Sequence, residues 1–236
     1  FIEYVTLLNL SGKYEKAYEL LLSRKLHPWE GGEGKAVAQY VAALVEMAKE
    51  KMRKGAWEEA ENLLQKALVY PENLGEGKLE GSKDNNVYYY LGLTKEALGD
   101  SESAKEYFRR ASVGPEEVAG MMYYNDQPAD MILYQGLAQY KLEQKGAGNR
   151  KMYKLIDFGE RHLQDEIKID YFAVSLPDLM IYEEDFTQKN KAHCNYVMGL
   201  GSLGLGKKEE AAAFFRETLK VDPFHLQCKI LLGEIG

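Results

Sequence analysis

Gly206-Lys-Lys-Glu-Glu-Ala211, followed by Phe215, Leu219 and Pro223, is the clearest copy of a phrase that recurs along the chain. In each copy a glycine precedes an alanine by five residues, and a large apolar residue follows the alanine by four. The glycine can end one helix in a left-handed conformation, and the alanine lets the next helix approach its neighbour closely. The phrase therefore predicts pairs of antiparallel helices. The other copies are Gly12 to Ala17 with Leu21, Gly55 to Ala60 with Leu64, and Gly99 to Ala104 with Phe108.

The first helix of each pair is found by counting back sixteen residues from the alanine. Ala104 leads to Tyr88, followed by Leu91-Gly92, and Ala211 leads to Asn195, followed by Met198-Gly199. The pattern resembles the tetratricopeptide repeat (TPR), W-x2-L-G-x2-Y…A-x3-F…P on two antiparallel helices. The resemblance implies an all-α, TPR-like right-handed α-solenoid of about five helix pairs with long inter-repeat insertion loops.

Residues 1–236 are expected to form a single repeat domain. Counting back from Ala17 leads to Phe1, so we expect the chain to open inside a first helix, as the C-terminal fragment of a longer protein. Apolar residues make up 45% of the sequence, which is enough for a core. The net charge of −7, without a lysine-arginine cluster, argues against nucleic-acid binding. No apolar run predicts a membrane span.

Cys194 and Cys228 are the only cysteines, and they are one repeat period apart. Axes of packed helices lie about 8–10 Å apart, whereas a disulfide needs Cα atoms within roughly 7 Å. We therefore expect two buried free thiols, which suits a cytoplasmic location.

Hydrophobic periodicity gives the expected helices and the spacing of the repeats. The alanines at 17, 60 and 104 are 43 and 44 residues apart, so each repeat carries an insertion beyond the compact 34. The fourth unit is predicted to be degenerate: Tyr134 and Leu137-Ala138 open it, but Gly146-Ala147-Gly148 is longer than a normal turn. The expected helices are 1–10, 14–24, 35–53, 57–69, 85–98, 101–112, 129–145, 150–164, 190–204, 208–219 and 224–235.

Two insertions share the pattern P-x3-G-E-G-K, at residues 28–35 and 71–78. Repeated glycines indicate shaped turns, so we expect both loops to follow the same backbone path. Two later insertions, at 122–130 and 170–178, carry adjacent aromatic and acidic residues. The aromatics can anchor the loops to the helices while the acids cap the next helix. Alternatively, the loops build a recessed polar site.

Four loop phrases resemble one uncharacterised bacterial family. Its members are large proteins with an N-terminal domain of unknown function, similar to sugar-mutarotase β-sandwiches, followed by a repeat region. The resemblance implies a link to carbohydrate metabolism, and it supplies no catalytic residue. The phrases are Trp29–Lys35, Asn73–Gly77, Tyr134–Leu137 and Asp170–Asp178.

Motifs for catalysis and cofactors are weak. Gly199-Leu-Gly-Ser-Leu-Gly204 fits a dinucleotide pattern, but that pattern needs a preceding strand, and these residues fall where a helix is expected. His193 and Cys194 are neighbours on a helix and point about 100° apart, so they do not converge on one metal ion. We expect no cofactor, no metal and no catalytic residue in this chain. A pair of loop carboxylates for glycoside chemistry stays a minor alternative.

The first functional hypothesis is a non-catalytic interaction scaffold. Its concave groove would bind a peptide, a partner protein or the N-terminal domain of the same polypeptide. The residue after each apolar start of a first helix is expected to line this groove, with hydrogen-bonding and stacking side chains. These residues are Val45, Tyr89, Gln135 and Tyr196.

The second hypothesis is an accessory region of a carbohydrate-active enzyme, whose insertion loops complete a sugar-binding pocket. Trp29 is expected to stay partly exposed beside Glu30 or Glu33, because it hangs from a glycine-rich turn. The residues of this pocket would be Trp29, Glu30, Tyr124, Asp126, Tyr171 and Asp178.

Overall fold

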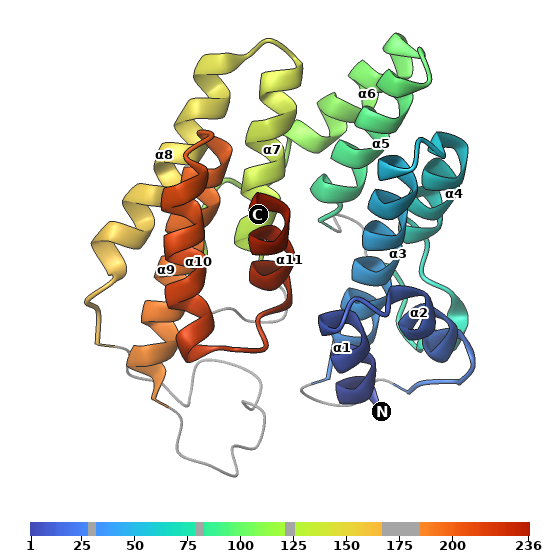
Figure 1. The fold of residues 1–236 in the computed structure, drawn as a ribbon, viewed down its shortest axis with the longest axis horizontal. Helices are drawn as coiled ribbons and strands as arrows, with labels where there is room; N and C mark the ends of the chain where they lie inside the picture. Colours follow the sequence, from blue (N-terminus) through green and yellow to red (C-terminus); the bar gives the residue numbers. More distant parts are fainter. Residues whose placement is uncertain (28–31, 79–82, 121–125, 167–184) are drawn as a thin grey trace. The chain divides into compact units, whose positions relative to one another are not determined.

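A computed structural model describes residues 1–27, 32–78, 83–120, 126–166 and 185–236, and within these it contains helices and no strand (Figure 1). The chain divides into two compact units. Unit 1 comprises Phe1–Gly114 and Leu137–Gln144, and unit 2 comprises Pro115–Gly136 and Lys145–Gly236. The all-α class predicted from the sequence is confirmed.

Unit 1 is built from three helix pairs and a short 3-10 helix, η1. Successive pairs pack on one another, and α3 lies against both α2 and α4 (Figure 1). The elements are α1 (Ile2–Leu10), α2 (Tyr14–Leu22), α3 (Lys35–Arg53), α4 (Trp57–Ala67), η1 (Glu72–Leu74), α5 (Asn85–Ala97) and α6 (Ser101–Ser112).

Unit 2 contains most of α7 and the remaining helices. Figure 1 shows α9 running beside α10, and α9 also packs on α8. The elements are α7 (Ala129–Lys141), which passes from unit 2 to unit 1 after Gly136, α8 (Lys145–His162), α9 (Phe186–Gly204), α10 (Lys208–Val221) and α11 (Leu226–Ile235).

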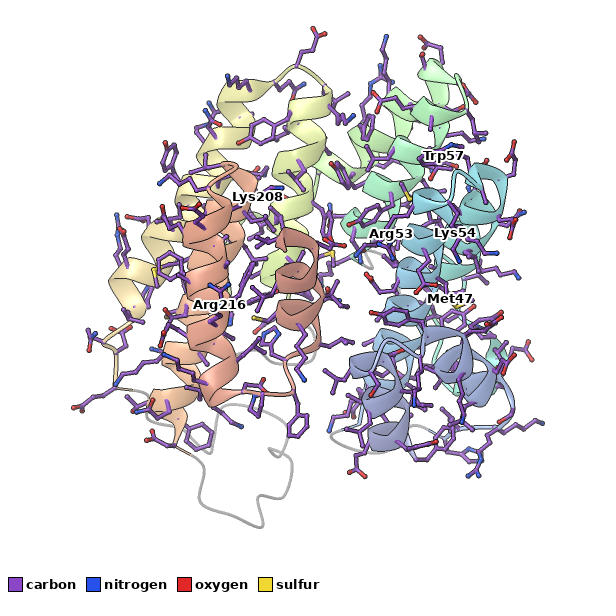
Figure 2. The ribbon with its side chains drawn as sticks, viewed as in Figure 1. Met47, Arg53, Lys54, Trp57, Lys208 and Arg216 are labelled. Atoms are coloured by element: carbon purple, nitrogen blue, oxygen red, sulfur yellow. The ribbon has the colours of Figure 1, made fainter. Side chains whose placement is uncertain are left out.

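The recurring phrase forms the turn within four helix pairs, α1–α2, α3–α4, α5–α6 and α9–α10, as predicted. Gly12, Gly55, Gly99 and Gly206 have φ angles of 70°, 74°, 81° and 78°, a conformation that other residues adopt at a cost. The alanine five residues later is buried in every copy, so the second helix packs closely on the first. At the Gly55 turn, Figure 2 labels Arg53 and Lys54 at the end of α3 and Trp57 at the start of α4.

A second glycine fixes the approach of the two helices. A Cβ placed on Gly92 would lie 2.4 Å from the ring of Phe108, and one on Gly199 would lie 2.5 Å from the ring of Phe215. In both pairs the aromatic residue follows the glycine by sixteen positions, so the ring of the second helix lies over the bare backbone of the first.

The fourth unit departs from the residue pattern, as predicted, but it keeps the spacing of the repeat, so the expected long turn at 146–148 is wrong. A Cβ on Gly136 would lie 2.3 Å from Met152, again sixteen positions later, so Gly136 and Met152 take the places of Gly92 and Phe108. Glu143 then occupies the turn position, with a φ of 62°. Gly146-Ala147-Gly148 is part of α8 rather than a long turn. The repeat was misplaced because glutamate replaces the turn glycine and glycine replaces the alanine.

The glycines of α9 serve helix packing. A Cβ on Gly201 would lie 2.6 Å from the carbonyl oxygen of Met152, and one on Gly204 would lie 2.1 Å from the Met152 sulfur. On the facing helix, a Cβ on Gly159 would lie 2.7 Å from the carbonyl oxygen of Cys194. The glycine-rich run therefore lets α8 and α9 approach at backbone distance, and it is helical, as expected.

The insertion loops of unit 1 are held to each other. The Asn73 amide donates to the carbonyls of Leu21 (2.9 Å) and Arg24 (2.7 Å), and the Glu76 carboxylate accepts from the Gly34 backbone N–H (2.7 Å). Residues 28–31 of the first loop lie outside the described residues. At the Gly34–Gly77 pair the predicted common path fails, because Gly34 has a φ of 76° whereas Gly77 does not adopt a left-handed conformation. The two glycines differ because they stand in different surroundings: Gly34 directly precedes the first residue of α3, whereas no helix begins after Gly77.

The cysteine prediction is confirmed. Cys194 and Cys228 are both free and buried. The Cys228 thiol donates to the Phe215 carbonyl at 3.3 Å, and burial raises its pKa to about 12. Both thiols are therefore packed inside unit 2 in the protonated form.

Candidate functional site

Half of the ten residues predicted to bind a ligand lie outside the described residues. Glu33 and Tyr89 belong to unit 1, and Asp126, Gln135 and Tyr196 belong to unit 2. Their binding roles stay predictions. The residues outside the described ranges are Trp29, Glu30, Tyr124, Tyr171 and Asp178.

In unit 1, Tyr89 packs inside an aromatic cluster. Its ring meets Tyr90 edge-on at 5.5 Å and lies 6.0 Å from the ring of Phe108. Burial raises the pKa of the Tyr89 hydroxyl well above its usual value. Glu33 lies in the turn before α3, next to the Gly34 N–H that Glu76 accepts.

In unit 2, Tyr196 is 4% exposed, and so is not an open groove residue. Its ring lies 4.3 Å from His225 and 6.1 Å from Phe215, and its hydroxyl finds no hydrogen-bond partner among the described residues. Burial, then the nearby charge of Asp130, raises its pKa well above the usual value. The position after the apolar start therefore faces the packing between helices, as Val45 also does.

Gln135 is fully buried, for a reason that follows from the corrected fourth repeat. It precedes Gly136, and so it takes the place of Leu91 before Gly92 rather than a groove position. Its amide oxygen accepts from the Lys151 ammonium at 2.9 Å, and its amide nitrogen donates to the Pro115 carbonyl at 3.1 Å. A glutamine in this core position is satisfied only because a chain segment lies beside it.

That chain segment, residues 115–119, connects α6 to α7 and forms no helix or strand. Pro115 offers its carbonyl to two amides, Gln135 and Gln127, the latter at 2.7 Å. Glu116 and Glu117 follow with ion pairs to Lys151 (2.9 Å) and Lys154 (2.7 Å).

The segment ends on α9. The His193 ring nitrogen Nε2 lies 2.9 Å from the carbonyl oxygen of Ala119. Burial lowers the pKa of His193, so at neutral pH the uncharged ring donates its Nε2–H to this carbonyl. We call the five side chains that hold segment 115–119 the segment-binding face; they are Gln127, Gln135, Lys151, Lys154 and His193.

Charge on the segment-binding face is concentrated in two lysines. The Lys151 side chain is 5% exposed, whereas that of its partner Glu116 is 62% exposed. Lys151 holds the pKa of the Glu116 carboxyl below its usual value. A buried ammonium needs an anionic partner, so the face favours an acidic chain at this point.

A buried acid lies at the start of α7 in the same unit. Asp130 is 4% exposed, and burial raises its pKa to about 6 although the backbone N–H groups of Asp130 and Met131 donate to it. It also contributes to the raised pKa of Tyr196. Among the described residues, His, Cys, Asp and Glu side chains form no group of three suited to a metal ion.

Sequence reasoning missed the segment-binding face. A signal was present: Lys151 directly precedes Met152 in α8, so a lysine stands among inward positions, and Glu116-Glu117 follows Gly114-Pro115. The misplaced fourth repeat concealed both. Within the part of the chain that the structure describes, no helix has the length and apolarity needed to cross a bilayer.

Comparison with known proteins agrees with the repeat. The family model described as tetratricopeptide repeat matches residues 86–112, which span α5 and α6. One similar solved structure is the MamA RS-1 ArsTM double mutant, at 14% identity over 83% of this chain and 82% of that chain, with a TM-score of 0.28. Another is YrrB, titled a TPR protein with an unusual peptide-binding site, at 14% identity over 99% and 90% of the chains, with a TM-score of 0.32. The family model thus identifies one tetratricopeptide repeat, at residues 86–112, within an all-α chain.

Proposed function

We propose that the chain is a non-catalytic protein-interaction scaffold that binds a polypeptide segment of a partner protein. Helical repeats present rigid surfaces that bind other chains without catalysing a reaction. The repeat at residues 86–112 supports this function. Its ligand would be a peptide, a partner protein or another domain of the same polypeptide.

The observation that carries the proposal is the way in which unit 2 holds segment 115–119. The Pro115 carbonyl accepts hydrogen bonds from Gln135 of α7 and from Gln127, two residues before α7, and the Ala119 carbonyl accepts one from His193 of α9. Contacts to main-chain groups are available to any non-helical peptide, so this set of helices already has the chemistry of peptide binding.

A selection from random twelve-residue peptides tests the scaffold function. The full chain is immobilised, and enriched peptides are then mapped by amide hydrogen exchange. We expect a recurring peptide motif and slower exchange at the ends of helices in one unit. Recovery of the same peptides from a surface without protein would overturn the proposal.

The carbohydrate alternative stays a prediction, because five of its six proposed residues lie outside the described ranges and only Asp126 lies within them. A glycan array probed with the full chain tests it. Binding to a pyranose series that is lost in Trp29→Ala, with unchanged helical content, would favour that alternative over the scaffold.

A further inference from the structure

Segment 115–119 and the segment-binding face differ in burial. Gln127, Gln135 and Lys151 are all buried, whereas Pro115, Glu116 and Glu117 are exposed. The donors are therefore fixed in unit 2 by packing, while the chain that they hold lies on the outside. This is the arrangement of a receptor and its ligand, not of two halves of a core.

The contacts also predict which residue type is favoured at each position of a bound peptide. The first residue supplies a carbonyl to two amide donors, and proline there leaves no N–H that would need a partner. The next two residues are acids that meet Lys151 and Lys154. A second carbonyl, four residues after the first, meets His193.

From this geometry we infer that the segment-binding face takes an acidic peptide of a partner protein, and that segment 115–119 occupies the face in cis. The inference rests on the proposed scaffold function and names the class of partner. The favoured ligand is a non-helical segment with two consecutive acids after a proline.

Occupation in cis lowers the apparent affinity for a partner. The segment is tethered at both ends, and a short tether gives an effective concentration on the order of millimolar. A partner peptide binds only when the face is free, so its apparent dissociation constant rises in inverse proportion to that free fraction. Freeing the face should therefore strengthen peptide binding by about tenfold or more.

The test uses the full chain and a labelled, end-blocked peptide of sequence Gly-Pro-Glu-Glu-Val-Ala-Gly, which copies residues 114–120. A released variant carries Pro115→Gly, Glu116→Ser, Glu117→Ser, Val118→Gly and Ala119→Ser. Fluorescence anisotropy should show binding to the released variant about tenfold or more tighter than to the natural chain. The same peptide with glutamine in place of both glutamates should bind several-fold more weakly.

A matched pair of lysine variants, made in the released chain, locates the binding. Lys154→Gln should weaken peptide binding several-fold and leave the melting temperature unchanged, because this side chain is only partly buried. Lys208→Gln removes the same charge from the exposed start of α10, labelled in Figure 2, and should have no effect.

Three results would overturn the inference: equal binding of the acidic and glutamine peptides, equal effects of the two lysine variants, or no binding to the released chain. If the released variant fails to fold, the milder variant Glu116→Gln with Glu117→Gln replaces it and should gain affinity in the same direction. A peptide motif enriched at unit 1 would keep the scaffold function while this inference fails. An absence of any enriched peptide would remove both.

Discussion

Repeat 3 (α5–α6) and repeat 4 (α7–α8) have the same internal spacing but different residues at the positions that matter. In repeat 3 the turn residue is Gly99, and in repeat 4 it is Glu143. The first helix of each begins beside a buried acid, Asp84 or Asp130. Asp84 has a countercharge, since Lys78 lies 2.7 Å from it, whereas within the described ranges Asp130 is supported by the backbone N–H groups of Asp130 and Met131.

The connecting segments that lead into the two repeats differ in the same way. Before repeat 3, Lys78 is fixed to the fold, because it also donates to the Leu68 carbonyl at 2.9 Å. Before repeat 4, residues 115–119 lie on the surface of unit 2, and they are held partly by ion pairs with the buried Lys151 and the partly exposed Lys154. Equal spacing therefore gives equivalent helices, but the side chains decide how the residues before each repeat are held.

The largest effect is expected for Lys78→Met. It leaves the buried Asp84 carboxylate without its cation, and removing one partner of a largely buried pair should cost about 2–3 kcal/mol. Urea denaturation measures this loss. Lys105→Met is the control, because its pair with Glu102 is exposed. Equal losses in the two variants would show that the segment before repeat 3 is not fixed by Lys78.

Asp130 should make the chain less stable as the pH rises. Its pKa is about 6 in the folded chain against 3.8 normally, so the folded state holds more protons between about pH 4 and 6. The free energy of unfolding should fall with rising pH through this window and then level off. Asp130→Asn should remove the fall and stabilise the chain at pH 7 by about 1–2 kcal/mol. Asp157→Asn, on the exposed side of α8, is the control and should leave the fall in unfolding free energy with pH unchanged.

Substitutions at the turn residues Gly99 and Glu143 should change the free energy of unfolding in opposite directions. Gly99→Ala should cost about 1 kcal/mol, because alanine must adopt a left-handed conformation. Glu143→Gly should gain about 0.5 kcal/mol, since the strain of the left-handed glutamate exceeds the entropy lost by glycine. The melting temperatures of both variants measure these changes. A lower melting temperature for Glu143→Gly as well as for Gly99→Ala would mean that Glu143 has a stabilising contact.

The smallest effect on stability is expected for Glu117→Gln. Its carboxylate is exposed and its partner Lys154 is partly exposed, so the unfolding free energy should change by less than about 1 kcal/mol. Hydrogen exchange at the amides of Val118 to Gly120 should nevertheless become several-fold faster, because the segment loses one of its ion pairs. Unchanged exchange would indicate that the other contacts hold the segment without this ion pair.

Much of this comparison was open to prediction from the sequence. The glycine turns, the buried alanines and the free thiols follow from local rules: which residues tolerate a positive φ, and which are small enough for close helix packing. The register of the fourth repeat was not predicted, because Glu143 and Gly148 stand at the positions where the other copies have glycine and alanine.

The sequence by itself determined the helix pairs and their all-α class, because repeated spacing imposes the same short-range packing on every pair. Only the tertiary structure decided that Lys78 is a countercharge and that Glu116 meets Lys151. It also decided that the predicted groove residue Tyr196 is buried. These contacts join residues far apart in the chain or separated by irregular segments, and no periodicity specifies them. They depend on where a connecting segment comes to lie, which packing and charge settle together.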